Sequence, residues 1–392
     1  MLREVLRQRA LVSGRLRAHH RAIAATLRAE EAPAERLAPH LQGAGDSLGA
    51  GRSWLDVARQ HIIDLRVADA LQAAATADEQ LALGGLGTDH ELRLEAKVLL
   101  GSAERIGGRL EAGRRHLEEV AATAAATTRA YRDALLGLGS IAGWAGDAEG
   151  FRHWLSLAHQ RATEAGDDER AGRALERMAR FESMVGHHAA ALALTQQVLD
   201  AGWDDGMAHR TALIVMGRAG DLEAARAHAG TGAMRLSREG HIGSRASLWN
   251  DLASVLVQGG DPQGAAEALV RAEADARRAG SAHILAYVLA NEGLLAARLG
   301  HYPHAAHRLE EAVVLTRDPR LQTLLSAVLL LPLAHLGRWH DFDQACEAAM
   351  GVLGRMGEDD APELVQRAIQ FARDAGEEAR ATTAEAVLQR LL

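Results

Sequence analysis

Apolar and small residues recur at helical spacing through most of the chain, and the pattern breaks off at glycines. The region around Gly300 shows this best: Gly293 lies seven residues before it, and Ala305, Leu309 and Ala312 follow it by five, nine and twelve residues. Small residues at these positions allow two antiparallel helices to approach closely, while the leucine fills the space between them. The pattern therefore predicts a helical hairpin that turns at Gly300.

Equivalent turn glycines recur along the chain. They are Gly108, Gly146, Gly186, Gly220, Gly260, Gly300 and Gly337, so the successive intervals are 38, 40, 34, 40, 40 and 37 residues. A weaker unit, without a turn glycine, surrounds Leu65. Periods of this size indicate stacked helical hairpins, because one hairpin cannot bury its apolar face without its neighbours. We expect an all-α superhelix, or solenoid, of about eight hairpins.

The hairpin pattern resembles the tetratricopeptide repeat. The unit at Gly300 also has an aromatic residue, Tyr302, two positions after the glycine, and Asp318-Pro319 near its end, where proline is expected to stop the second helix. The resemblance implies a right-handed superhelix in which the first helix of each hairpin lines a concave, partner-binding face. Most intervals exceed the 34 residues of that family, which predicts longer helices or longer loops.

Composition favours helices and excludes several classes of function. Aromatic residues make up only 3% of the chain, which disfavours β-sheet. Lys97 is the only lysine, so a phosphate-binding Gly-Lys-Ser/Thr loop is impossible. The 52 acidic residues outnumber the 44 basic ones, and this balance argues against direct contact with nucleic acid.

The sequence carries no signal for an intrachain disulfide, for export or for membrane insertion. Cys346 is the only cysteine, and arginine and glutamate residues interrupt the N-terminal region. The most apolar stretch, Leu324 to Leu336, is too short to span a bilayer and contains Pro332, so it predicts a buried helix. We expect a cytoplasmic protein with no membrane partner.

Residues 1–50 differ from the repeats and carry a second resemblance. They comprise an Arg3-Glu4-Val5-Leu6 opening, a basic helix around His20, Ile23 and Leu27, a segment Leu37–Leu41 after a proline-bearing linker, and Gly45-Asp46. This order resembles the junction that leads from a winged-helix element into the helical repeats of STAND-type signalling ATPases, including maltose-type transcription activators. The resemblance implies the sensor arm of a bacterial signalling or transcriptional regulator, with an ATPase or effector module in cis or in trans.

Three segments follow from these two resemblances. Residues 1–50 form the N-terminal helical segment, and residues 51–360 form the repeat array. Residues 361–392 either form a capping hairpin or lead into a further domain.

Candidate chemical motifs do not assemble into a reactive centre. His301, His304 and His307 are spaced to share one helical face, but no carboxylate or cysteine completes a metal site, and a solvated polar face is the simpler interpretation. The glycine-rich segment 137–143 resembles a dinucleotide-binding loop but falls within an expected helix, where it favours close helix packing. We expect no catalytic residues, no metal site and no cofactor, and hence no enzyme.

A binding surface on the concave face is the better hypothesis. In tetratricopeptide repeats, outward positions of the first helices contact ligands. The corresponding positions here are Glu95, Asp133, Arg173, Glu176, Arg180, Arg210, Asn250 and Tyr287, with Trp144 and Trp249 nearby.

The arginines on this face have two interpretations. Arg173, Glu176 and Arg180 share one helical face, so they either form an intrahelical charge ladder or, with Arg210, offer guanidinium groups to a carboxylate or an acidic peptide. In the second case Asn250 would bond to the peptide backbone. Tyr287 would add an amphipathic contact.

The leading hypothesis is a non-enzymatic scaffold that binds a protein, a peptide or a small ligand. The alternative is a structural adaptor or oligomerisation scaffold.

Overall fold

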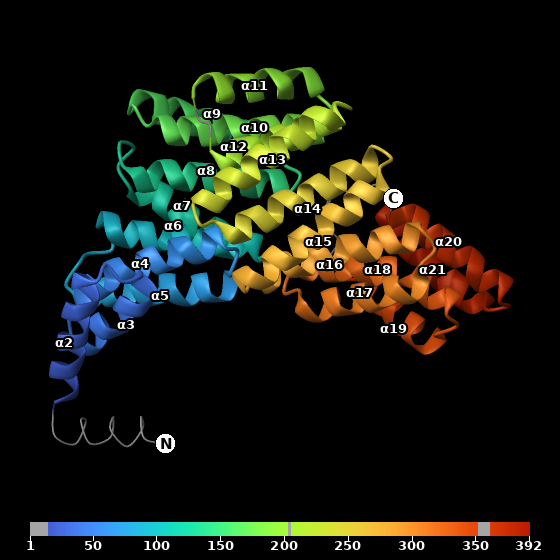
Figure 1. Cartoon of the computed structure of the whole chain (residues 1–392), viewed down its shortest axis with the longest axis horizontal. Helices are drawn as coiled ribbons and strands as arrows, with labels where there is room; N and C mark the ends of the chain where they lie inside the picture. The colour runs from blue at the N-terminus through green and yellow to red at the C-terminus, as the bar shows by residue number, and fades with distance from the viewer. Residues whose placement is uncertain (1–14, 203–204, 352–360) are drawn as a thin grey trace. The chain divides into compact units, whose positions relative to one another are not determined.

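Every element of the described chain is an α-helix. The computed structural model describes residues 15–202, 205–351 and 361–392, and within these ranges helices α2 to α21 follow one another with no β-strand (Figure 1). The all-α class and the helical-repeat arrangement predicted from the periodicity are confirmed. The Arg3-Glu4-Val5-Leu6 segment lies outside the described residues.

Tertiary contacts divide the chain into two units. Unit 1 holds the described residues up to Ile63 together with Val67–Ile106 and Leu110–Leu138. Unit 2 holds Gly139–Leu392 and the turn segments Asp64–Arg66 and Gly107–Arg109. The division falls inside α8 (Arg129–Trp144), whereas the boundary predicted at residue 50 falls inside α4 (Ser47–Ile63).

Unit 1 is built from helices that pack against their neighbours in sequence. Besides α4 and the first part of α8, it contains α2 (Leu16–Ala29), α3 (Ala34–Ala44), α5 (Val67–Leu83), α6 (Glu91–Ile106) and α7 (Leu110–Thr123). Gly45 ends α3 with a φ of 75°, in the left-handed conformation that is common at the ends of helices. Leu55, Ala58 and Leu81 are fully buried in the core of this unit.

Unit 2 continues the same pattern over a longer stretch. After α8 it contains α9 (Ala148–Glu164), α10 (Asp168–Met184), α11 (His188–Asp200), α12 (Gly206–Arg218), α13 (Leu222–Arg238), α14 (Ile242–Gln258), α15 (Pro262–Ala279), α16 (Ala282–Arg298), α17 (Tyr302–Leu315), α18 (Pro319–His335), α19 (Trp339–Ala349), α20 (Ala361–Asp374) and α21 (Glu378–Leu391). The last two helices occupy the segment predicted as a capping hairpin.

The turns explain the repeated glycines. All seven turn glycines adopt φ angles between 65° and 93°, a region that glycine enters without steric cost. In three turns the next residue is an aspartate that caps the second helix, as where the Asp147 carboxylate accepts a hydrogen bond from Gly150 N at 2.8 Å. The unit without a turn glycine places Leu65 in the same conformation, with a φ of 56°. That unit therefore has the same turn, but its backbone is strained there, because the Cβ of a leucine is crowded in this conformation.

Small residues bring the two helices of a hairpin close together, as the pattern predicted. A Cβ atom on Gly293 would lie 2.5 Å from Leu309 Cγ, and one on Gly139 would lie 2.5 Å from Leu155 Cδ2. Gly139 belongs to the glycine-rich segment 137–143, which lies within α8. That segment therefore serves helix packing and not a strand-to-helix loop.

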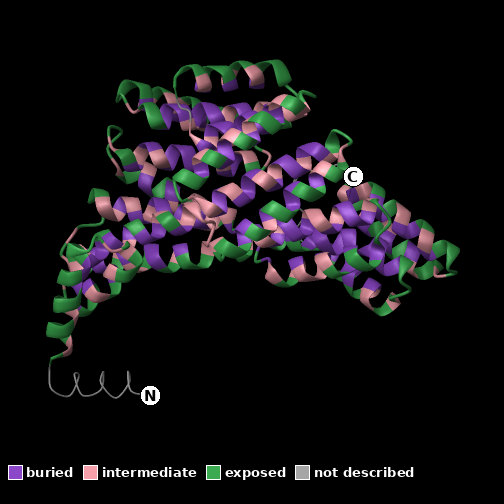
Figure 2. Ribbon diagram, in the orientation of Figure 1, coloured by how far each residue is buried: buried purple, intermediate pink, exposed green. Residues whose placement is uncertain are grey.

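The apolar stretch from Leu324 forms a buried helix, as predicted. Helix α18 is buried along nearly its whole length, whereas α11 is mostly exposed (Figure 2). One expectation at this place is wrong: Asp318-Pro319 does not end α17, which stops at Leu315, but begins α18, because Asp318 caps that helix and proline fits its first turn. None of the described helices combines the length and apolarity that crossing a membrane requires.

The first helices of the unit 2 hairpins line one side of the array. In the described chain α10, α12, α14, α16 and α18 each contact the next of the set, whereas α11, α13, α15 and α17 make no comparably extensive contacts with one another. Close spacing on one side and wide spacing on the other curves such an array. The first helices therefore lie on the concave side of unit 2.

Candidate binding surface on the first helices of unit 2

A row of polar side chains joins the first helices of consecutive hairpins. Arg173 Nη2 of α10 lies 2.5 Å from Asp205 Oδ2 at the start of α12, and Arg210 Nε of α12 lies 2.6 Å from Asp251 Oδ2 of α14. Asn291 of α16 continues the row, because its side-chain amide donates to Asn250 Oδ1 of α14 at 2.9 Å. We call the residues that α10, α12, α14 and α16 contribute to this line the inner polar row.

The register of the repeat places these residues together. Glu176, Arg210 and Asn250 each lie ten residues before the turn glycine of their hairpin, at Gly186, Gly220 and Gly260 respectively. Equivalent positions on stacked helices face the same side. The places of these three residues in the inner polar row therefore follow from the sequence period.

Arg173 is held by two carboxylates. Besides Asp205, it lies 3.0 Å from Glu176 Oε2, one turn further along α10. Burial raises the pKa of Glu176, although Arg173 acts in the opposite direction. Asp205 also accepts hydrogen bonds from Met207 N and Ala208 N and so caps α12. The intrahelical pair Arg173–Glu176 therefore forms, and the second pair, Arg173–Asp205, ties α10 to α12.

Arg180 differs from the other two arginines of the row. It lies one turn beyond Glu176 on α10 and makes no hydrogen bond or ion pair with any residue that the structure describes. Burial and the positive charge of Arg210 lower the pKa of Arg180 to about 10, while Asp251 and Glu176 act against this shift. The Arg180 guanidinium therefore interacts with the charges of two carboxylates but pairs directly with none among the described residues, and burial of a charge without such a pair is unfavourable.

The asparagine pair offers both a donor and an acceptor. Asn291 Nδ2 donates to Asn250 Oδ1 and also to Ser254 Oγ at 3.3 Å. The side-chain nitrogen of Asn250 (Nδ2) and the side-chain oxygen of Asn291 (Oδ1) make no hydrogen bond to the described part of the chain. One free donor beside one free acceptor matches the hydrogen-bonding groups of an extended peptide.

Three of the predicted residues lie away from the row. Glu95 of α6 accepts a hydrogen bond from Arg59 Nε at 2.8 Å, and Asp133 of α8 lies 3.6 Å from Arg129. Both belong to unit 1. Trp144 ends α8 and is 41% exposed, with the Arg320 guanidinium 5.4 Å from its ring centroid.

Trp249 and Tyr287 serve the packing of the hairpins. The Arg271 guanidinium of α15 lies 5.0 Å from the Trp249 ring centroid, so this tryptophan faces the second helix of its own hairpin. Tyr287 packs on the apolar core with its ring edge-on to His283. Trp249 cannot share the direction of Asn250, because consecutive helical residues differ by about 100°.

Four members of the row were not predicted from the sequence: Asp205, Asp251, Ser254 and Asn291. A signal for two of them was present, because Asp251 and Asn291 both lie nine residues before their turn glycines, Gly260 and Gly300. Asp205 gave no such signal, since it lies at the start of its helix and joins the row through the Arg173 side chain.

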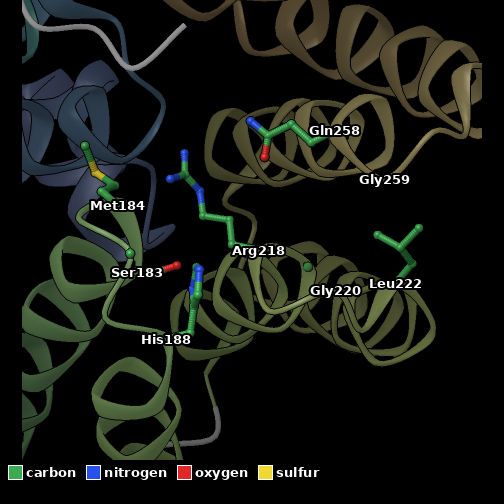
Figure 3. A pocket seen from close by; sticks show the side chains of 10 residues that line it. Ser183, Met184, His188, Arg218, Gly220, Leu222, Gln258 and Gly259 are labelled. Carbon is green, nitrogen blue, oxygen red and sulfur yellow. The ribbon is translucent and has the colours of Figure 1, made fainter. Parts of the chain in front are cut away.

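A pocket of about 430 Å³ lies at the carboxyl ends of α10, α12 and α14. Met184, Arg218 and Gln258 line it, and each lies two residues before the turn glycine of its hairpin. Figure 3 shows the Arg218 side chain rising between Met184 and Gln258, with Ser183 and His188 below it.

The described residues offer little for metal or nucleophilic chemistry. They contain no group of three or more histidine, cysteine or acidic side chains arranged to hold a metal ion. Burial raises the pKa of the Cys346 thiol to about 12, so this cysteine is a poor nucleophile. Burial, together with Arg308 and the neighbouring histidines, lowers the pKa of His304.

Comparison with known proteins identifies the fold. No family model and no curated protein matches the sequence. Among solved structures, a Rap protein in complex with competence and sporulation factor matches with a TM-score of 0.55 and 11% identity, over 87% of this chain and 96% of that one. Aspartyl phosphate phosphatase F from Bacillus subtilis matches at 0.49 and 11%, over 87% and 93%. The human IFIT1 dimer with PPP-AAAA matches at 0.40 and 12%, over 95% and 90%. At such low identity the likeness to the Rap protein shows a shared helical-repeat fold and nothing more.

Proposed function

We propose that this chain is a binding scaffold that holds an extended, acidic peptide segment along the inner polar row of unit 2. The observation that carries this proposal is that Arg180, on the concave side, forms no ion pair with a carboxylate of the described residues. An acidic side chain of a bound segment would supply that partner. The free donor and acceptor of the Asn250–Asn291 pair would bond to its backbone.

The comparison is compatible with this proposal. The solved Rap protein that shares the fold is in complex with competence and sporulation factor, so this architecture can accommodate a bound factor. A peptide suits the row better than a nucleic acid does, because Arg173 and Arg210 already have acidic partners and the net charge of the chain is −8.

The biological role that we propose is that of a sensor or interaction arm in a bacterial STAND-type regulator. It rests on the resemblance of residues 1–50 to the junction before the repeats in such regulators. Ligand binding would act by favouring one curvature of the array, which requires different affinities for two states. The partner would be an ATPase or effector module in cis or in trans, in the cytoplasm, and the chain itself would be no enzyme.

Peptide binding can be tested directly. The chain would be incubated with a soluble library of random nonapeptides, and the retained peptides would be identified by mass spectrometry and synthesised with a fluorescent label. We expect selected peptides to be rich in aspartate and glutamate, and fluorescence anisotropy should show at least tenfold weaker binding to Arg180→Gln. Arg238→Gln is the matched control, because Arg238 is exposed on the second helix α13.

Two outcomes would contradict the proposal. One is a library that yields no peptide retained by the folded chain. The other is equal loss of binding in the Arg180→Gln and Arg238→Gln variants. If the first outcome coincides with concentration-dependent self-association in light scattering, the chain is an oligomerisation scaffold instead.

A further inference from the structure

The pocket at the carboxyl ends of α10, α12 and α14 suggests where one end of the bound peptide lies, an inference that rests on the proposed function. The pocket lies on three of the four helices that form the inner polar row, but nearer their turns. From Asn250 to Gln258 along α14 is about 12 Å at 1.5 Å per residue, which three or four extended peptide residues would span. The positive charge of Arg218 also acts on Arg180, so the pocket and the row are electrostatic neighbours.

Arg218 brings a positive charge into this pocket. Its guanidinium makes no hydrogen bond or ion pair with the residues that the structure describes. Glu182, which precedes Ser183 in the chain, is already bound by Arg152 Nε at 3.0 Å and by His187 Nδ1 at 2.6 Å. One uncompensated guanidinium matches one carboxylate in charge and in bidentate geometry.

A buried serine, Ser183, also lines this pocket. This residue is 1% exposed, and its hydroxyl has no hydrogen-bond partner among the residues that the structure describes. Figure 3 shows this hydroxyl directed toward the space beside His188 and Arg218. A buried hydroxyl without a partner is unfavourable unless another group accepts a hydrogen bond from it. An acceptor oxygen of a ligand would satisfy it.

The groups around the pocket favour a ligand in which a negatively charged group lies beside a small apolar group. Helix α11 begins at His188, and its preceding residue makes no side-chain cap, so the amide groups of the first turn remain available. Backbone carbonyls at the ends of α10 and α12 accept hydrogen bonds from the amides of the following turns. The His187 amide, for example, donates to the Glu182 carbonyl at 2.8 Å. Gln258 adds an amide donor, and Met184 and Leu222 supply apolar walls.

We propose that this pocket receives the terminal carboxylate of the peptide held on the inner polar row, with Arg218 and the Ser183 hydroxyl as its binding groups. The methionine and leucine walls would contact the last side chain of that peptide. The site would thus select peptides by the position of their free end as well as by their sequence.

The test compares two forms of one selected peptide. The best nonapeptide from the library would be prepared as the free acid and as the C-terminal amide, and its Kd measured by fluorescence anisotropy. We expect amidation to weaken binding to the unaltered chain about 10-fold to 100-fold, because a charge-assisted pair is lost. Acetylation of the peptide N-terminus is the matched control and should leave the Kd unchanged.

Variants locate the effect. The Arg218→Gln variant should bind the free-acid peptide as weakly as the unaltered chain binds the amidated peptide. Amidation should cause no further loss of affinity in that variant. Ser183→Ala should reduce the effect of amidation in part. Circular dichroism would establish that each variant keeps its helical content.

The outcomes separate the two proposals. Selected peptides that bind equally well as acid and amide would overturn the carboxylate pocket but leave the row intact. An amidation effect that persists unchanged in Arg218→Gln would also overturn it. A library without any retained peptide would overturn both proposals.

Discussion

Arg210 and Asp251 form an ion pair between two consecutive first helices, with 2.6 Å between Nε and Oδ2. Their side chains are only 16% and 20% exposed. Removal of either partner therefore leaves the other charge in poorly hydrated surroundings. The pair thus links the stability of unit 2 to the surface that we propose binds the ligand.

We expect Arg210→Ala to lower the free energy of unfolding by about 2 kcal/mol, since it leaves Asp251 without its partner. The double variant Arg210→Ala/Asp251→Ala should be less destabilised than the sum of the two single variants. Urea titrations followed by circular dichroism measure all three. Strictly additive losses would show that the pair contributes nothing as a pair.

Arg180→Gln should have the opposite effect on stability. The lowered pKa of Arg180, about 10, means that the folded protein disfavours its charge, chiefly through burial and then through Arg210. Replacement by a neutral side chain should raise the free energy of unfolding by about 1–3 kcal/mol at pH 7 while it weakens peptide binding. A variant that is destabilised in the urea titration would contradict this prediction.

Gly217→Ala should disturb the contact between α12 and α14. A Cβ atom at Gly217 would lie 2.1 Å from Val255 Cγ1, so the two first helices would have to separate. We expect a loss of about 1–3 kcal/mol and weaker peptide binding. Gly230→Ala in α13 is the control, because outside its own stretch of helix no described atom lies within 4 Å of the added Cβ. This change should stabilise the helix by about 0.5–1 kcal/mol. Equal effects of the two substitutions in thermal denaturation would refute the packing argument.

The helical hairpins could be predicted from the sequence because their signals are local. A turn such as Gly260-Asp261 combines a left-handed glycine with a helix cap, and both depend only on neighbouring residues. Even the unit without a glycine follows this rule, since Leu65 adopts the same backbone conformation. The start of α18 was misjudged because Asp318-Pro319 is compatible with the end of one helix and the start of the next.

The partners within the inner polar row were less predictable. The repeat register placed Arg210 and Asn250 on one face, but it did not show that Asp251 would neutralise Arg210 while Arg180 stayed unpaired. Such pairing depends on the rotation and spacing of neighbouring helices, which a period of about 40 residues does not determine. Trp249 was equally hard to place, because it precedes Asn250 by one residue and its side chain therefore faces α15 and not the row.

Acidic conditions should stabilise unit 2 through Glu292. Burial, and next the charge of Glu273, raise the pKa of Glu292 to about 7, although Arg308 lies 2.9 Å away and acts in the opposite direction. The folded state therefore binds a proton more tightly than the unfolded state between about pH 4.5 and 7. This contribution to stability is fully present below that window and is lost as the pH rises through 7.

Glu292→Gln tests this expectation, because the variant carries a permanently neutral side chain at the same place. We expect the unaltered chain to lose up to about 3 kcal/mol from this residue between pH 5 and pH 8. The variant should lack that loss and be the more stable protein at pH 8. Urea midpoints measured at pH 5, 6.5 and 8 for both proteins provide the comparison, with Glu363→Gln on the separate helix α20 as a control. Parallel pH profiles for the chain and its Glu292→Gln variant would show that Glu292 is ionised throughout this range and that Arg308 outweighs its burial.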